Sequence, residues 1–249
     1  MRNKLPDLVA ILFAAVLAVV LTACGGGSDP APESSTTSAS AAADDDMTLT
    51  LVRHGQSAGN SSGVIITTVP GPDLTDLGRE QSKTAAAAFK DRDFDGVYAS
   101  PMVRTQQTAE PTAADLRMKT VVVDGIQEIP AGDYEGTPEA DAAKTYLVAP
   151  IKWTEGDLSA RMPGAESGEE FQKRVNGAIA KIRDAGSRKP VVFSHSGTIT
   201  TWTLMNVKDK KGRALPADLL KNTGYVVVKG SLEKGWTLQE WHTAPAGEK

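Results

Sequence analysis

The chain has 249 residues, of which 40% are hydrophobic and 23% are charged, and its formal net charge is −4. This composition is typical of a globular domain with a buried core, and the length corresponds to one or two domains. The acidic balance argues against a nucleic-acid-binding protein, which needs a basic face to neutralise phosphates. It does not exclude a pocket for a single phosphate group, because two or three converging arginines suffice for that.

Residues 1–23 predict a lipoprotein signal peptide that is not part of the fold. Arg2 and Lys4 give it a positive start, and residues 8–21 form an unbroken apolar run that is short for a membrane span. The segment LTAC, which ends in Cys24, resembles a bacterial lipobox, in which the cysteine is lipidated and becomes the first mature residue. Cys24 is the only cysteine, so an intramolecular disulfide is excluded. An uncleaved anchor, or a secretory signal with an incidental cysteine, is the alternative.

Residues 24–46 predict a flexible linker. They are mainly Gly, Ser, Thr, Ala, Pro and Asp, without a large apolar side chain, so they cannot bury enough surface to offset the entropy of ordering. Two or more acyl chains on Cys24 would hold the protein stably on a membrane. We therefore expect a domain that is tethered to the extracytoplasmic face of the cell membrane.

From Met47 onward, the pattern predicts alternating strands and helices. The elements expected in chain order are a strand over 48–52, a helix over 75–90, a strand over 94–99, a helix after it, a strand over 119–123, a helix from a capping box at 167–170 to about 185, a strand over 191–193, a helix over 197–204, and strands over 225–228 and 236–241. Ser100 is expected to cap the second helix, with Pro101 at its first position. This alternation predicts a single α/β domain over 47–245, with a largely parallel central sheet.

Two of the three histidines follow predicted strands. His54 comes after the 48–52 strand and His195 after the 191–193 strand, whereas no motif surrounds His242. Ligands of open α/β sheets bind beyond the carboxyl ends of the strands, so His54 and His195 are candidates for one site. By itself, a histidine at a strand end is more often a structural hydrogen-bonding group, and the tripeptide RHG is weak evidence.

Five sequence blocks strengthen the interpretation of these histidines. LVRHGQSAGN, SPMVRTQQTA, QEIPAGDYEG, PGAESGEEFQKRV and VVFSHSGTI occur in this order. Together they resemble the histidine phosphatase superfamily, the phosphoglycerate mutase-like group, over about residues 48–203. The resemblance implies a three-layer α/β/α fold and a phosphomonoester hydrolase that works through a phosphohistidine, without a cofactor or a metal ion.

The resemblance also implies roles for individual residues. His54 is the nucleophile that attacks phosphorus, and Glu128 is the proton donor to the leaving group. The residues expected to bind the transferred phosphate are Arg53, Asn60, Arg104 and His195. These residue types suit the chemistry, because a neutral imidazole is nucleophilic near pH 7 and a guanidinium group matches two phosphate oxygens. Arg104 is expected near a helix start, where free N–H groups also favour an anion.

Simpler structural interpretations compete with these roles. Arg53 and Arg104 could form surface ion pairs, Glu128 could be a solvated loop carboxylate, and Asn60 could cap a turn. Ser167 belongs to a recurrent block of the family, but the capping box explains it without catalysis.

The sequence leaves three alternatives open for the function. One is a phosphoglycerate mutase-type phosphotransferase, although such enzymes usually carry a longer insertion after the block around Glu128. A second is a lipoprotein that binds a phosphorylated ligand without catalysis. A third is a metallohydrolase that uses His54 and His195, for which the chain shows no set of carboxylate ligands at a recognised spacing.

The chain departs from the family pattern beside the expected phosphate pocket. Gln56 and Gly59 stand where many members have Glu and Trp, and the loop over 61–72 is rich in small and β-branched residues. This loop usually lines the leaving-group side of the site, so the departures bear on the substrate. We expect a phosphorylated small molecule or a phosphoprotein, and the sequence specifies neither the substrate further nor the oligomeric state.

Overall fold

The structure is a computed structural model that describes residues 46–247. The predicted signal peptide over 1–23, Cys24, and all but the last residue of the 24–46 linker lie outside the described residues. No helix among the residues that the structure describes has both the length and the apolar character needed to cross a membrane.

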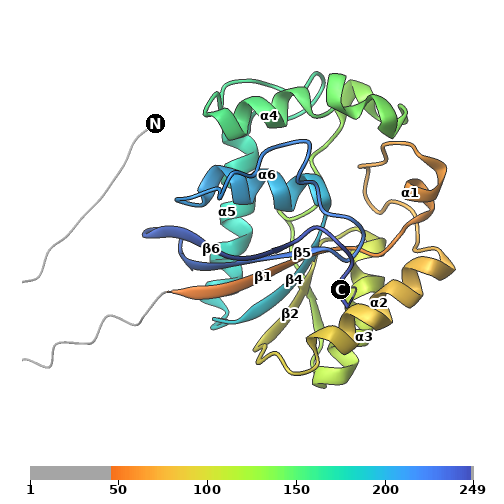
Figure 1. The fold of residues 1–249 in the computed structure, drawn as a ribbon, viewed down its shortest axis with the longest axis vertical. Coiled ribbons are helices and arrows are strands. Elements are labelled where there is room, and N and C mark those ends of the chain that lie inside the picture. Colours follow the sequence, from red (N-terminus) through yellow and green to blue (C-terminus); the bar gives the residue numbers. More distant parts are fainter. Residues whose placement is uncertain (1–45, 248–249) are drawn as a thin grey trace, which may run out of the picture. The chain divides into compact units, whose positions relative to one another are not determined.

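A six-stranded sheet forms the centre of the domain (Figure 1). Its strands lie in the order β3-β2-β4-β1-β5-β6. The strands are β1 (Met47–Arg53), β2 (Gly96–Ala99), β3 (Thr120–Val122), β4 (Pro190–Ser194), β5 (Tyr225–Ser231) and β6 (Gly235–His242). The strands β3, β2, β4 and β1 are parallel to one another, whereas β5 is antiparallel to both β1 and β6. The prediction of an α/β domain with a largely parallel sheet is confirmed.

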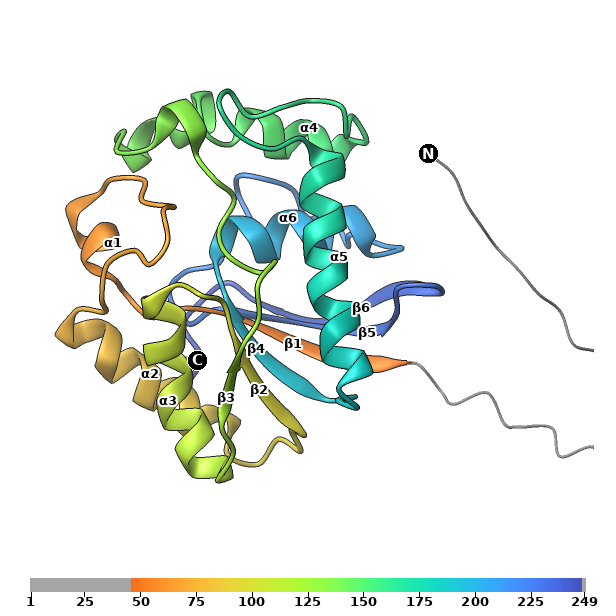
Figure 2. The same ribbon diagram turned by 180° about the vertical axis from the view of Figure 1, so that it is seen from behind.

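Helices cover both faces of the sheet and give the fold three layers (Figure 2). The helices α2 (Asp76–Phe89) and α3 (Val103–Leu116) pack on one face. The other face is covered by α5 (Gly168–Asp184) and α6 (Ser196–Asn206), and α4 (Val148–Glu155) packs against both of these helices.

The two faces follow from the alternation of side chains along each strand. In β1, Leu49 and Leu51 are buried in the apolar cluster shared with α5 and α6, whereas Val52 is buried in the cluster shared with α2 and α3. In β4, Val192 belongs to the first cluster and Phe193 to the second. Because β1 and β4 are apolar on both faces, they occupy the centre of the sheet.

The predicted capping box at the start of α5 is confirmed. The Ser167 hydroxyl accepts from the Glu170 N–H, and the Glu170 carboxylate accepts from the Ser167 N–H. The short elements between the strands were not predicted, because each has too few residues for a helical period. These elements are α1 (Ala58–Ser62), η1 (Gly132–Tyr134) and η2 (Glu139–Lys144), of which the last two are 3₁₀ helices, together with α4.

The predicted cap of α3 is wrong. The helix begins at Val103 rather than at Pro101, and the residue at its N-cap is Met102, which makes no side-chain cap. The Ser100 hydroxyl lies 2.8 Å from His195 Nε2 instead. Ser100 is thus a partner of a predicted site residue, and the helix starts two residues later than the local sequence suggests.

Candidate active site

The carboxyl ends of three adjacent strands meet at one edge of the sheet. Arg53 ends β1 and His54 follows it, His195 follows β4 directly, and Arg104 lies in the first turn of the helix after β2. The rings of His54 and His195 have centroids 5.1 Å apart. The structure therefore brings together four residues that lie up to 142 positions apart, because β2, β4 and β1 are neighbours in the sheet.

The hydrogen bonds of His54 fix which of its ring nitrogens carries the hydrogen. His54 Nδ1 lies 2.7 Å from the Gly55 carbonyl oxygen, which can only accept, so Nδ1–H is the donor. Arg104 Nε donates to His54 Nε2 over 3.1 Å, and this requires a lone pair on Nε2. The basic nitrogen of a neutral imidazole thus points toward the Arg104 guanidinium.

The surroundings of His54 keep its ring neutral. Burial lowers the pKa of His54 well below its usual range, and the positive charges of Arg104 and Arg53 lower it further. The hydrogen bond to Gly55 acts in the opposite direction. His54 is only 3% exposed, so the neutral ring is available as a nucleophile over a wide range of pH.

Arg104 lies in the first turn of α3, as predicted, and is buried. Its Nη2 donates to the Ile66 carbonyl over 3.2 Å, while its Nη1 has no partner within the described residues. Burial lowers the pKa of Arg104 to about 10, and it remains charged near pH 7. Because a buried polar atom without a partner is rare, Nη1 indicates a place for an acceptor that belongs to a ligand.

Arg53 and His195 show the same feature. Arg53 Nη1 donates to the Leu220 carbonyl over 2.5 Å, whereas its Nε is buried without a partner among the described residues. The Nε2 of His195 contacts Ser100, and its Nδ1 is likewise buried and unpartnered in the part of the chain that the structure describes. Burial lowers the pKa of His195 well below its usual range, and Arg104 lowers it further. The interpretation of Arg53 and Arg104 as surface ion-pair formers is therefore wrong.

Glu128 lies at the amino end of α6. Its Oε1 accepts from the Thr198 N–H over 2.8 Å and from the Thr198 hydroxyl and the Ile129 N–H, whereas its Oε2 accepts only from the Gly197 N–H, over 3.1 Å. A Cβ atom at Gly197 would lie 2.8 Å from Oε1, so glycine allows this close approach. Glu128 is thus held in place rather than solvated, and Oε2 keeps capacity for a further hydrogen bond.

An ion pair behind Glu128 supports the segment that carries it. Arg174 donates to both oxygens of Glu166, and its Nη1 also donates to the carbonyls of Gly125 and Gln127 over 2.8 and 3.0 Å. The side chains of Arg174 and Glu166 are only 16% and 13% exposed. Glu166 therefore has a structural role, in which it holds the arginine that binds the segment of Glu128.

Asn60 lies beside His54 but has its oxygen engaged. It is the third residue of α1, and its Oδ1 accepts from the Ser57 N–H over 3.2 Å in a capping box. Asn222 Nδ2 donates to Asn60 Oδ1 and to the His54 carbonyl, both over 3.2 Å. The interpretation of Asn60 as a turn cap is thus confirmed, and Asn60 also lines the cavity.

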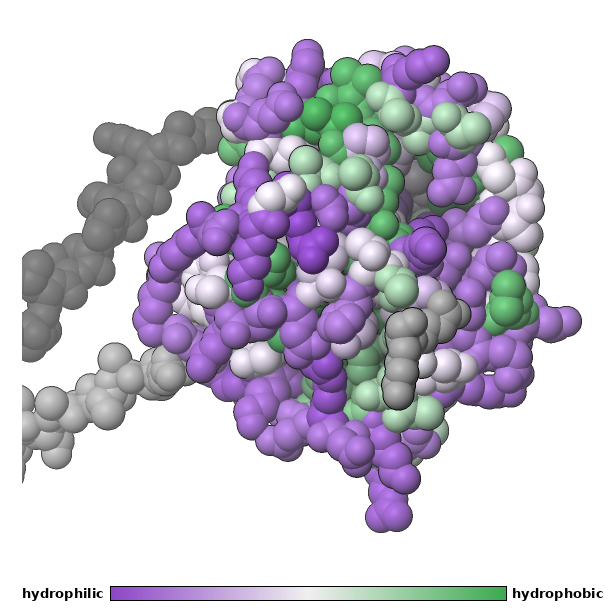
Figure 3. Space-filling model, viewed as in Figure 1, coloured by the Kyte–Doolittle hydropathy of each residue, from purple (hydrophilic) through white to green (hydrophobic). Residues whose placement is uncertain are grey.

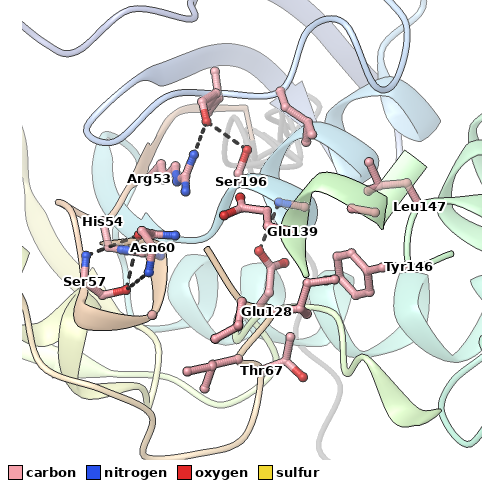
Figure 4. Close-up of a pocket in the computed structure, with 18 of the residues that line it drawn as sticks. Arg53, His54, Ser57, Asn60, Thr67, Glu128, Glu139, Tyr146, Leu147 and Ser196 are labelled. Atoms are coloured by element: carbon pink, nitrogen blue, oxygen red, sulfur yellow. Dashed lines mark hydrogen bonds between the residues drawn. The ribbon is translucent and has the colours of Figure 1, made fainter. Parts of the chain in front are cut away.

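A cavity of about 420 Å³ opens in front of these residues (Figure 4). The predicted site residues that line it are Arg53, His54, Asn60, Arg104 and Glu128. His195 does not line it and packs behind the His54 ring. Figure 4 shows His54, Ser57 and Asn60 on one side of the cavity and Tyr146 and Leu147 on the other.

Sequence reasoning missed the side of the cavity formed by η2 and the start of α4. Glu139, Tyr146 and Leu147 line the cavity there. Tyr146 is buried and donates to the Ile129 carbonyl over 2.8 Å, and burial raises its pKa well above the usual range. No strand end or motif marks these residues, so the sequence carried no signal for them.

The fold and the site define a phosphoglycerate mutase-like α/β domain with two histidines and two arginines at its strand ends. The model of the histidine phosphatase superfamily, branch 1, matches residues 49–244. The chain belongs to this superfamily, and the domain that the structure describes is a histidine phosphatase domain.

Several known proteins are similar to this chain over most of the described domain. A Mycobacterium tuberculosis protein, PE-PGRS family protein PE_PGRS11, is 39% identical over 217 residues, which cover 81% of this chain but only 37% of that relative. Phosphoserine phosphatase 1 of Hydrogenobacter thermophilus is 30% identical over 149 residues, which cover 59% of this chain and 70% of that enzyme. A mycobacterial glucosyl-3-phosphoglycerate phosphatase has the same fold, with a TM-score of 0.64 and 22% identity over 79% of this chain and 99% of that one.

Proposed function

We propose that the protein is a phosphomonoester hydrolase that works through a phosphohistidine at His54. The observation that carries this proposal is the orientation of the His54 ring, with Nδ1–H bound to the Gly55 carbonyl at 2.7 Å and Nε2 facing Arg104 at 3.1 Å. This arrangement presents the lone pair of Nε2 to whatever the Arg104 guanidinium binds. In this structure Arg104 donates to that lone pair, so attack on phosphorus requires the bound phosphate to draw the guanidinium away from Nε2.

The phosphate would bind to the buried donors that have no protein partner among the described residues. These are Arg53 Nε and Arg104 Nη1, which both belong to residues that line the cavity. A role of His195 in binding the phosphate stays a prediction, because His195 does not line the cavity. Phosphoryl transfer spreads negative charge over the equatorial oxygens, so its catalysis depends mainly on such fixed positive groups.

In the first step, His54 Nε2 forms a bond to phosphorus and the ester P–O bond breaks. A proton on Glu128 Oε2 passes to the departing alkoxide, which is a poor leaving group without it. The phosphorylated ring is cationic, because it keeps the hydrogen on Nδ1, and the Gly55 carbonyl stabilises this charge. In the second step, water attacks phosphorus, Glu128 accepts the proton of that water, and the P–N bond breaks to release phosphate and neutral His54.

We also propose that the enzyme acts outside the cytoplasm, held on the membrane by lipid on Cys24. The sequence pattern of residues 1–24 supports this location. Incorporation of a labelled fatty acid by the wild-type chain, and its loss in Cys24→Ser, is the expected result. A label that persists in Cys24→Ser would contradict the anchor without affecting the proposed chemistry.

A phosphorylated small molecule is the proposed substrate, as the names of several relatives suggest. The test is hydrolysis of 4-nitrophenyl phosphate by the purified protein, with wild type and His54→Ala compared. We expect turnover that vanadate inhibits, that a chelator leaves unchanged, and that falls at least about 10³-fold in His54→Ala. No turnover on any phosphomonoester would contradict the enzyme assignment, and full activity in His54→Ala would contradict the nucleophile. Interconversion of phosphoglycerates would favour the mutase alternative.

A further inference from the structure

We propose that the alcohol released from the substrate has an apolar body and no carboxylate. This inference rests on the proposed phosphatase function and concerns the part of the same cavity that lies beyond the phosphate donors. It names a substrate class: phosphomonoesters of neutral, largely apolar alcohols, as opposed to phosphorylated hydroxy acids.

Apolar residues form a large part of the lining of the cavity, which we call the apolar wall. Three segments far apart in the sequence contribute to it, one after α1, one in η2 and the following turn, and one before β5. The apolar residues that they contribute are Val64, Ile65, Ile66, Ala140, Ala142, Ala143, Tyr146, Leu147, Pro216, Leu219 and Leu220. Figure 3 shows hydrophobic surface over α4, and Val148, the first residue of that helix, is 42% exposed.

The loop that carries the first of these segments is fixed in place. The Glu135 carboxylate accepts from the Thr67 N–H over 2.9 Å and from the N–H and hydroxyl of Thr68. Ile65 also donates its N–H to the Thr137 carbonyl over 2.9 Å, and its own carbonyl accepts from Gly136. The apolar wall is therefore built by hydrogen-bonded backbone, and a ligand meets it already formed.

The charges in the cavity disfavour a second anion on the substrate. Among the described residues that line it, the cations are Arg53, Arg104 and Lys221. The two arginines face the phosphate position, and Lys221 is exposed to water. Glu139 lines the same space, and its charge acts on Arg53.

A substrate carboxylate in this part of the cavity would lose water without gaining a buried cation, which is costly. It would also lie near the negative charge of Glu139, and the repulsion between two like charges disfavours binding. An apolar group of the same size has no hydration of a charge to lose, and it gains apolar contact with the wall of the cavity.

The test compares the purified wild-type protein on four primary-alkyl phosphates whose leaving groups differ little in reactivity. Glycerol 3-phosphate and 3-phosphoglycerate share a three-carbon skeleton and differ by the carboxylate, while 2-phenylethyl phosphate and ethyl phosphate differ by the apolar ring. We expect kcat/KM to be at least about 10-fold higher for glycerol 3-phosphate than for 3-phosphoglycerate. We also expect 2-phenylethyl phosphate to exceed ethyl phosphate by at least about 10-fold.

Two variants test whether the residues of the cavity cause these ratios of kcat/KM. Glu139→Lys is expected to narrow the ratio between glycerol 3-phosphate and 3-phosphoglycerate, whereas Glu110→Lys, which makes the same charge change at an exposed position of α3, should leave it unchanged. Ala143→Trp is expected to lower kcat/KM for 2-phenylethyl phosphate more than for ethyl phosphate. Effects of these changes on Arg53 cancel in the ratios, because both substrates share the phosphate.

The outcomes separate the inference from the function on which it rests. Hydrolysis of 3-phosphoglycerate as fast as glycerol 3-phosphate, or no gain from the phenyl ring, would overturn the substrate class while the phosphatase assignment stands. If the ratio of kcat/KM between glycerol 3-phosphate and 3-phosphoglycerate is the same in Glu139→Lys and Glu110→Lys, Glu139 does not exclude the carboxylate. An absence of turnover on all four substrates and on 4-nitrophenyl phosphate would overturn both proposals.

Discussion

The two sides of the cavity are built in different ways. The phosphate side consists of buried, charged or polar side chains at the ends of central strands. His54 and Arg104 are each 3% exposed there, and His195, which is 0% exposed, packs against the His54 ring. The other side consists of apolar residues on short helices and loops, and Glu139, which also lines the cavity, is exposed. The sheet therefore positions the reacting groups, whereas the connections between strands shape the space for the alcohol.

The two sides should therefore respond differently to substitution. Changes at the strand ends should lower the rate on every phosphomonoester, because all substrates share the phosphoryl group. Changes on the opposite wall should alter the preference between substrates.

After His54→Ala, the substitution Arg104→Lys should produce the largest loss of activity. Lysine keeps a positive charge but loses the Nε–H that faces His54 and the second donor aimed at the phosphate position. We expect kcat to fall about 10²- to 10³-fold on all substrates, with steady-state kinetics as the measurement. Arg79→Lys on the exposed face of α2 is the matched control, and a loss of activity confined to some substrates would contradict the shared role.

Glu128→Gln should lower the rate in a way that depends on the leaving group. Gln cannot supply the proton, so turnover of an alkyl phosphate should fall about 10²-fold or more. Turnover of 4-nitrophenyl phosphate should fall less, because nitrophenolate departs without protonation. The ratio of kcat for the two substrates is the measurement, and equal losses on both would argue that Glu128 serves only to hold the start of α6.

Arg174→Met tests whether the segment that carries Glu128 needs its support. The substitution leaves Glu166 nearly buried without its partner and releases the carbonyls of Gly125 and Gln127. We expect a loss of about 3 kcal/mol in the free energy of unfolding and a kcat about 10-fold lower on alkyl phosphates. The exposed pair of Arg161 supplies a control, since Arg161→Met should cost at most about 1 kcal/mol. A normal kcat on alkyl phosphates in Arg174→Met would show that the ion pair does not position Glu128.

The smallest expected effect is the dependence of stability on pH. Burial lowers the pKa of both His54 and His195 well below the usual range, and Arg104 lowers both further. Below about pH 6.5 the unfolded chain therefore binds protons that the folded chain does not. The free energy of unfolding should decrease as the pH falls from 7.5 to 5.5.

Urea unfolding at these two pH values measures this dependence. His54→Gln should lose less stability than wild type over the range, because one of the two groups no longer titrates. His242→Gln, at a histidine with a 51% exposed side chain, should lose as much as wild type. An equal loss in wild type and His54→Gln would contradict the assignment of the pH dependence to the site.

The phosphate side could be predicted from the sequence because its residues follow recognisable strands. His54 and His195 each stand directly after an apolar strand, and parallel strands place their carboxyl ends at one edge. Arg104 and Glu128 needed the resemblance to a family, since an arginine in a helix and a glutamate in a loop carry no such local signal. The mistaken cap at Ser100 shows the limit of local rules: its hydroxyl is used by His195, 95 residues away.

The opposite side could not be predicted, for a physical reason. Glu139 and Leu147 are brought to the cavity by short helices that depend on tertiary contacts, and Ile65 is fixed by pairing with the backbone near Thr137. Such elements have too few residues for a hydrophobic period. The departure of the 61–72 loop from the family pattern did indicate where the substrate side would differ, but not that it would be apolar.

The most direct test of the account is to trap the phosphorylated enzyme. The purified protein is mixed with a substrate that carries a labelled phosphoryl group, quenched within the first turnovers, and digested. We expect label on the peptide that contains His54, and this label should be lost in mild acid, be retained in base and be absent from His54→Ala. A phosphoryl group that withstands acid, or one that still forms in His54→Ala, would contradict the central claim that His54 Nε2 is the nucleophile.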